Sequence, residues 1–164
     1  MRIVFASLAL ALAGCGFQLR GTASLPFDTL YMAPTTSPGV ALDLKRNIQS
    51  GTKTTLVDDP KRADALLELT QEAREKVILS LAGTGRVREY QLRYRVAFRV
   101  HDGKGGEFIP PSTVLLTRDV TYNDSDVLAK EAEEVLVYRD MQFDMVQQLM
   151  RRLAAAQRPK PAAQ

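Results

Sequence analysis

The chain has 164 residues, of which 45% are hydrophobic and 25% charged, and its formal net charge is +3. These values are those of one ordinary globular domain, and they exclude collagen-like, coiled-coil and wholly disordered chains. One cysteine and one histidine cannot form a closed Cys/His zinc site or a disulfide framework, and so small a positive charge does not indicate a nucleic-acid partner.

The N-terminus has the pattern of a secretory signal followed by a lipidation site. Arg2 precedes an apolar or small run over residues 3–14, which is shorter than the ~20 residues needed to cross a membrane. The sequence Leu12-Ala13-Gly14-Cys15 resembles the bacterial lipobox, in which cleavage precedes the cysteine and the thiol carries a diacylglycerol. We therefore expect residues 1–14 to be a signal peptide and Cys15 to be the acylated first residue of the mature chain.

The acylated cysteine also indicates a location. A bacterial lipoprotein carries three acyl chains, and two or more chains hold a protein firmly to a membrane. Gly16 follows the cysteine in place of the aspartate that retains such proteins in the inner membrane. The sequence therefore favours the periplasmic side of the outer membrane.

The mature chain begins with a predicted strand and a predicted helix. Residues 27–33 mix apolar and polar side chains between two prolines, which is typical of a strand. Residues 40–50 carry apolar side chains at helical spacing, and Gly51 stands where a C-cap glycine is expected. An Asp-Asp-Pro sequence at 58–60 predicts a turn.

A long hairpin is predicted over residues 64–100. Its first strand covers 65–79, its second covers 86–100, and Gly83-Thr84-Gly85 forms the turn between them. Successive side chains of a strand point to opposite faces, so the second strand has one apolar face and one arginine-rich face. We expect the apolar face to pack under the helices, in particular through Leu92, Val96 and Phe98.

The chain continues with a further strand and a long helix. A glycine-rich turn at 103–106 precedes the strand, which follows Pro110-Pro111 and alternates up to Tyr122. Residues 123–125 offer N-cap side chains for an amphipathic helix of about 29 residues. Residues 15–156 thus predict one small α+β domain with the order β-α-β-β-β-α, a mixed four-stranded sheet and two helices on one face. Residues 157–164 are predicted to be a disordered tail.

No catalytic residue, metal or cofactor is expected. His101 and Asp102 contain the groups of a base and its orienting carboxylate, but no motif places a nucleophile beside them, so we interpret them as turn residues. The adjacent carboxylates Asp58-Asp59 and Glu133-Glu134 are interpreted as solvated. The glycine-rich segment 103–106 lacks the phosphate-loop pattern. We therefore do not expect an enzyme.

The second hairpin strand is strongly basic. Between residues 86 and 99 there are five arginines and one acid, a local charge of +4. One interpretation is an exposed face that charge keeps soluble and protects from unwanted pairing. The other is an anion site, because guanidinium groups match phosphate oxygens. At the outer membrane, the abundant phosphorylated ligand is the lipid A part of lipopolysaccharide.

The chain resembles the LptE family of lipopolysaccharide-assembly lipoproteins. The element order matches, and four short motifs carry the resemblance: Gly14-Cys15-Gly16-Phe17-Gln18-Leu19-Arg20-Gly21, Glu89-Tyr90-Gln91-Leu92, Leu128-Ala129-Lys130-Glu131 and Leu149-Met150-Arg151-Arg152-Leu153. The resemblance implies a plug complex with the outer-membrane β-barrel LptD, a role in assembling that barrel, and binding of lipopolysaccharide on its way to the cell surface.

The resemblance also implies site residues. Lys130 matches a family lysine tied to lipopolysaccharide binding. The family's hairpin-tip arginine aligns with Gly83, so Arg86 or Arg88 would supply that charge. The second strand adds three secondary candidates, Arg93, Arg95 and Arg99. The alternative function is a purely structural lipoprotein that fills the barrel without contacting the ligand.

Overall fold

The computed structural model describes residues 24–36, 38–122 and 127–159. The expected signal peptide, Cys15, the N-cap residues 123–125 and residues 160–164 lie outside the described residues. The described elements are β1 (Thr29–Met32), α2 (Pro38–Gly51), β2 (Thr55–Leu56), a 3-10 turn (Pro60–Arg62), β3 (Ala65–Leu81), β4 (Val87–His101), β5 (Glu107–Thr121) and α3 (Val127–Ala154).

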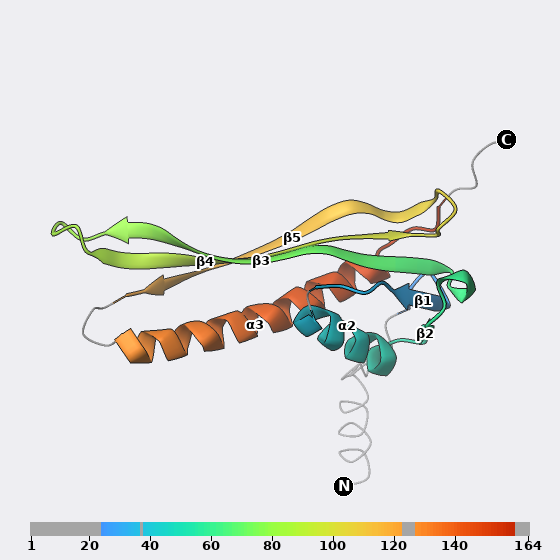
Figure 1. The fold of residues 1–164 in the computed structure, drawn as a ribbon, viewed down its shortest axis with the longest axis horizontal. Coiled ribbons are helices and arrows are strands. Elements are labelled where there is room, and N and C mark those ends of the chain that lie inside the picture. Colours follow the sequence, from blue (N-terminus) through green and yellow to red (C-terminus); the bar gives the residue numbers. More distant parts are fainter. Residues whose placement is uncertain (1–23, 37, 123–126, 160–164) are drawn as a thin grey trace, which may run out of the picture.

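The fold is α+β, with a mixed sheet and both helices on one face, as predicted (Figure 1). The strand order is β2-β1-β3-β4-β5, in which β1 is parallel to both of its neighbours and the other pairs are antiparallel. The sheet therefore has five strands and not the predicted four. The additional strand, β2, contains only two residues and pairs with β1 at Thr29↔Thr55 and Leu30↔Leu56.

The predicted hairpin is present and dominates the sheet. β3 and β4 contain 17 and 15 residues, and Gly85 adopts a positive φ in the turn that joins them. β5 begins before Pro110-Pro111, earlier than predicted. The two prolines together oppose Arg99 in a β-bulge, and β5 is an edge strand, where missing N–H donors are tolerated.

The core lies between the sheet and the two helices. Leu92, Val96 and Phe98 are buried, which confirms the predicted apolar face of β4. α2 contributes three buried apolar residues at helical spacing (Val40, Leu44 and Ile48), and α3 contributes five (Met141, Met145, Val146, Leu149 and Leu153). All five lie in the second half of α3, so the domain is packed mainly at one end.

α2 ends differently from the prediction. Gly51 is the last helical residue and does not have a positive φ, so it is not a left-handed C-cap. Thr52 instead closes the helix, because its backbone N–H and its hydroxyl both donate to the carbonyl oxygen of Ile48, at 3.1 and 2.8 Å.

The first half of α3 leaves apolar side chains exposed. Leu128 is 82% exposed and Val135 is 68% exposed, although both fit the predicted apolar periodicity of the helix. Figure 1 shows the reason: α2 lies beside the second half of α3 only, and the first half runs on beneath the far end of the hairpin.

In the part of the chain that the structure describes, each helix is too short or too polar to span a membrane.

Candidate functional site

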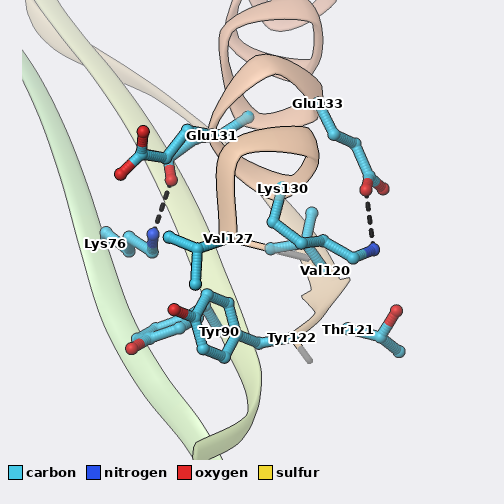
Figure 2. Close-up of a pocket in the computed structure, with 10 residues that line it drawn as sticks. Lys76, Tyr90, Val120, Thr121, Tyr122, Val127, Lys130, Glu131 and Glu133 are labelled. Carbon is cyan, nitrogen blue, oxygen red and sulfur yellow. Dashed lines mark hydrogen bonds and ion pairs between the residues drawn. The ribbon is translucent and has the colours of Figure 1, made fainter. Parts of the chain in front are cut away.

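A small pocket lies between the far end of the hairpin and the first turns of α3 (Figure 2). Its volume is about 80 Å³, well below the ~300–1,000 Å³ of pockets that enclose a drug-sized ligand. It can therefore hold one small polar group but not a whole glycolipid. The lining residues are Lys76, Tyr90, Val120, Thr121, Tyr122, Val127, Lys130, Glu131, Glu133 and Glu134.

A β-bulge in β3 brings charged side chains to this pocket. Leu69 pairs with Phe98, but Glu72 pairs with Val96, so three residues of β3 span two of β4. The alternation of faces shifts by one residue at this point, and the helix-facing positions of β3 become charged beyond it. Lys76 occupies one of these positions, opposite the buried Leu92.

Lys76 is held by a carboxylate and by aromatic rings. Its Nζ lies 2.6 Å from Glu134 Oε2 on α3 and 4.4 Å from the ring centroid of Tyr90. Tyr90 in turn packs edge-to-face on Tyr122, with 5.2 Å between ring centroids. The hydrogen bond to Glu134 raises the pKa of the Lys76 ammonium above its ordinary value, although partial burial opposes the shift. This lysine is therefore a fixed positive charge in the pocket.

Lys130 is the predicted site residue that lines the pocket. Its Nζ lies 2.7 Å from Glu133 Oε2, one turn along α3, and its side chain is 25% exposed. Two lysines and three glutamates line the pocket, so the lining carries one negative charge in excess. An incoming anion would therefore have to displace a carboxylate from at least one ammonium group.

A polar network beside the pocket fixes the hairpin to α3. The Tyr94 hydroxyl donates to Glu72 Oε1 at 2.6 Å, and the Tyr138 hydroxyl donates to the Glu75 carbonyl oxygen at 2.8 Å. Burial, with the hydrogen bond to Glu72, raises the pKa of Tyr94, and burial raises that of Tyr138.

The same network reaches α2. Arg74 donates to Gln142 Oε1 at 2.8 Å, and the Gln142 amide donates to Asp43 Oδ2 on α2 at 2.7 Å. The Arg74 guanidinium also lies over the Tyr94 and Tyr138 rings, at 4.8 and 5.6 Å from their centroids. Polar contacts therefore position the pocket where apolar packing is sparse.

The secondary arginines lie on the other face of the sheet. Arg93, Arg95 and Arg99 alternate with buried β4 residues and so point away from the helices. Acidic and amide side chains contact all three. Arg99 Nε lies 2.7 Å from Glu68 Oε2, Arg95 lies 4.0 Å from Glu75, and Arg93 donates to Gln91 at 2.9 Å. The structure thus separates these arginines from Lys130.

Arg86 and Arg88 stand at the tip of the hairpin, and both are exposed. Arg86 follows the turn, where its carbonyl oxygen accepts from Ala82 N at 2.7 Å. Arg88 is the extra residue of a bulge, because Ser80↔Glu89 is followed directly by Leu81↔Val87. The tip and the first turn of α3 lie at the same end of the molecule (Figure 1).

His101 and Asp102 do not form the base and orienter that their adjacency suggested. His101 Nε2 lies 3.1 Å from Glu68 Oε1, and its Nδ1 accepts from Gly103 N at 3.1 Å. Asp102 Oδ1 accepts from the backbone N–H groups of Lys104 and Gly106 at 2.7 and 2.8 Å, which shapes the turn.

Among the described residues, no group of three or more potential ligands is placed to hold a metal ion.

Sequence reasoning predicted one lining residue of this pocket, Lys130. Lys76, Tyr90 and Glu134 were not candidates, because Lys76 stands in a polar part of β3 and Tyr90 was assigned only to the apolar face of β4. The available signal was the run Glu72, Arg74, Lys76, whose spacing of two puts three charges on one face of a strand.

Comparisons with known proteins agree with this architecture. The model of the LptE family, described as lipopolysaccharide-assembly, matches residues 27–153. An LPS-assembly lipoprotein LptE from Pectobacterium atrosepticum is 30% identical over 154 residues, covering 92% of this chain and 83% of the relative. The protein of the same name from Yersinia enterocolitica is 33% identical over 162 residues, covering 93% and 75%.

Solved structures share the fold. The solution structure of an uncharacterized lipoprotein B from Nitrosomonas europaea is 39% identical, with a TM-score of 0.72, and covers 85% of this chain and 91% of that one. The crystal structure of the rare lipoprotein B from Shewanella oneidensis has a TM-score of 0.68 at 24% identity, covering 77% and 94%. The second likeness supports the fold alone.

Proposed function

The chain belongs to the lipopolysaccharide-assembly LptE family, and from this premise we propose that it is a lipid-anchored subunit of the outer membrane. It forms a plug complex with the β-barrel LptD and supports assembly of that barrel. It also binds lipopolysaccharide for transport to, and insertion at, the cell surface. The observation that carries the ligand role is the position of Lys130, which lines a pocket with a second lysine at the hairpin end of the molecule.

The anchor is Cys15. Removal of the signal peptide 1–14 would leave the cysteine as the first residue, acylated and on the periplasmic side of the outer membrane. The domain would then cover residues 15–156, followed by the tail 157–164. Arg158 of this tail contacts the start of the described fold, since its Nε donates to the Pro26 carbonyl oxygen at 2.7 Å.

Two surfaces support a complex with a barrel. The outer sheet face, with its paired arginines and glutamates, is polar, and the interior of an outer-membrane barrel is polar as well. The hairpin end and the first half of α3 expose apolar side chains, which a protein partner would cover. These side chains are Val77, Ile78, Leu79, Leu81, Leu128, Val135 and Leu136.

The ligand contacts are assigned to the basic residues of the hairpin end. Arg86, Arg88 and Lys130 are the primary contacts for the phosphates of lipopolysaccharide. Arg93, Arg95 and Arg99 remain secondary, because they lie on the opposite face of the sheet from Lys130. The alternative is a structural plug without ligand contact, which the excess of carboxylates in the pocket favours.

Isolation of the acylated protein from detergent-solubilised outer membranes tests this proposal. Mass spectrometry of the protein and lipid that accompany it should identify a large outer-membrane β-barrel together with lipopolysaccharide. Recovery of the barrel without lipopolysaccharide would support the structural plug. Recovery of neither would contradict both functions.

A further inference from the structure

We propose that Lys76 binds the ligand phosphate together with Lys130, and that Glu133 holds the Lys130 ammonium group away from Lys76 until the phosphate arrives. This inference rests on the proposed lipopolysaccharide binding and deepens it. It adds one binding residue, Lys76, and one positioning residue, Glu133, to the same site. The ligand group is a phosphate monoester on a sugar.

The position of Lys76 supports its role as a binding residue. Its ammonium group lines the pocket and is fixed by Glu134 and by the face of Tyr90. About a third of the Lys76 side chain remains exposed, so the residue is accessible from solvent. A positive charge that is already immobilised loses little conformational freedom when an anion binds.

Glu133 competes with an incoming phosphate for the ammonium group of Lys130. Figure 2 shows its ammonium turned toward Glu133, on the far side of the pocket from Lys76. Ion pairs of this kind along a helix are weak. A phosphate carries more charge than one carboxylate and accepts several charge-assisted hydrogen bonds. Exchange of Glu133 for phosphate is therefore favourable, and it would bring both lysines onto one anion.

The negative lining gives this exchange a second consequence. With Glu133 in place, the pocket has one negative charge in excess, which repels anions that cannot displace the carboxylate. Glu133 thus lowers affinity for all anions and selects those that bind Lys130 more strongly than it does. Removal of the carboxylate should strengthen binding, which a merely structural residue would not do.

The test compares Glu133→Gln with Asp144→Asn in the full acylated chain. Both variants remove one negative charge from α3. Asp144 is bonded to Arg118 at 2.6 Å and lies 11 residues further along, about 16 Å on a helix, beyond the ~8 Å screening length at physiological salt. Binding to immobilised lipopolysaccharide is measured by surface plasmon resonance. Binding to glucosamine 1-phosphate, with glucosamine as blank, is followed by NMR.

We expect Glu133→Gln to bind both probes about three- to tenfold more tightly than wild type, and Asp144→Asn to bind them like wild type. Lys76→Gln should weaken binding about tenfold, and in a Lys130→Gln background Glu133→Gln should keep only the part of its effect that comes from weaker charge repulsion. Equal affinities for Glu133→Gln and Asp144→Asn would overturn the inference. If Lys76→Gln does not fold, the Glu133 comparison decides alone.

Failure of the inference and failure of the proposed function are distinguishable. Wild-type protein that binds lipopolysaccharide, with Glu133→Gln unchanged, overturns only the inference. Wild-type protein that binds neither probe overturns both. A response of the sugar phosphate alone would support the site and assign it to free phosphate esters instead of the lipid headgroup.

Discussion

Lys76 on β3 and Glu134 on α3 form an ion pair with 2.6 Å between Nζ and Oε2, although 58 residues separate them in the chain. The pair joins the far end of the hairpin to the exposed half of α3. The buried residues of α3 all belong to its second half, so polar contacts take over at this end. The geometry of the pocket therefore depends on them.

Glu134→Gln should loosen the hairpin locally while leaving the domain folded. Both partners are partly exposed, so the loss in unfolding free energy should be about 1 kcal/mol or less. Hydrogen exchange of the β3 and β4 amides near the tip should become faster, with little change beside the core. Glu131→Gln is the control, since it removes a carboxylate from the same stretch of helix. Equal exchange at the tip in both variants would contradict the role of the pair.

Stability should fall at alkaline pH. The pKa values of Lys76, Tyr94 and Tyr138 are all raised in the folded protein, from ordinary values of 10.5, 10.0 and 10.0. A raised pKa contributes stability that is complete below the unfolded value and is lost as the pH rises toward the folded value. Urea melts should therefore show a decline that begins near pH 10. Tyr94→Phe, which removes the largest of these shifts, should make the decline shallower. An unchanged slope would refute this assignment.

Phe98→Ala tests the register of the hairpin. Phe98 is 1% exposed and packs in the core beneath the helices, so truncation should cost about 3–5 kcal/mol in a denaturant melt. Leu128→Ala is the matched truncation of an exposed apolar residue and should stay within about 0.5 kcal/mol. A loss below ~1 kcal/mol for Phe98→Ala would mean that the apolar face of β4 is not the buried one.

The strong periodicities predicted most of the fold. Alternation over β4 identified its buried face, and helical spacing identified α2 and α3, because these patterns extend over many residues. β2 was missed because two residues carry no periodic signal, and its parallel partner β1 lies across a helix in the sequence. Periodicity also identified the apolar stripe of α3, but not that α2 is too short to cover Leu128 and Val135.

The candidate site was less predictable for a related reason. Family resemblance pointed to Lys130, and local charge pointed to the arginines, but neither shows which residues meet in space. The bulge in β3 turns Lys76 toward α3, and such a shift in alternation cannot be read from spacing alone. Glu68 and Glu75, which compensate Arg99 and Arg95, stand on a different strand, so the local charge of +4 overstated the basicity of that face.

Cys15→Ser tests the anchor. An alcohol cannot form the thioether to diacylglycerol, so the precursor should remain uncleaved and unacylated. Mass spectrometry of the wild-type protein should find three acyl chains on Cys15, with no residue before it. A mature N-terminus at another residue would rule out the lipobox assignment.

The central claim, that the basic residues of the hairpin end bind lipopolysaccharide, is tested most directly by charge reversal. The variant Arg86→Glu/Arg88→Glu/Lys130→Glu is compared with wild type for lipopolysaccharide binding at two salt concentrations. Arg46→Glu/Lys53→Glu/Arg62→Glu, at exposed basic residues away from the pocket, is the control with the same change in charge.

Each lost contact between a basic residue and a phosphate is worth about 1.5–3 kcal/mol and weakens with salt. The account predicts a loss of several tens-fold or more for the first variant, with folding and barrel co-purification retained, and near wild-type binding for the control. Wild-type binding by the first variant would contradict the ligand role of these residues and leave the structural plug.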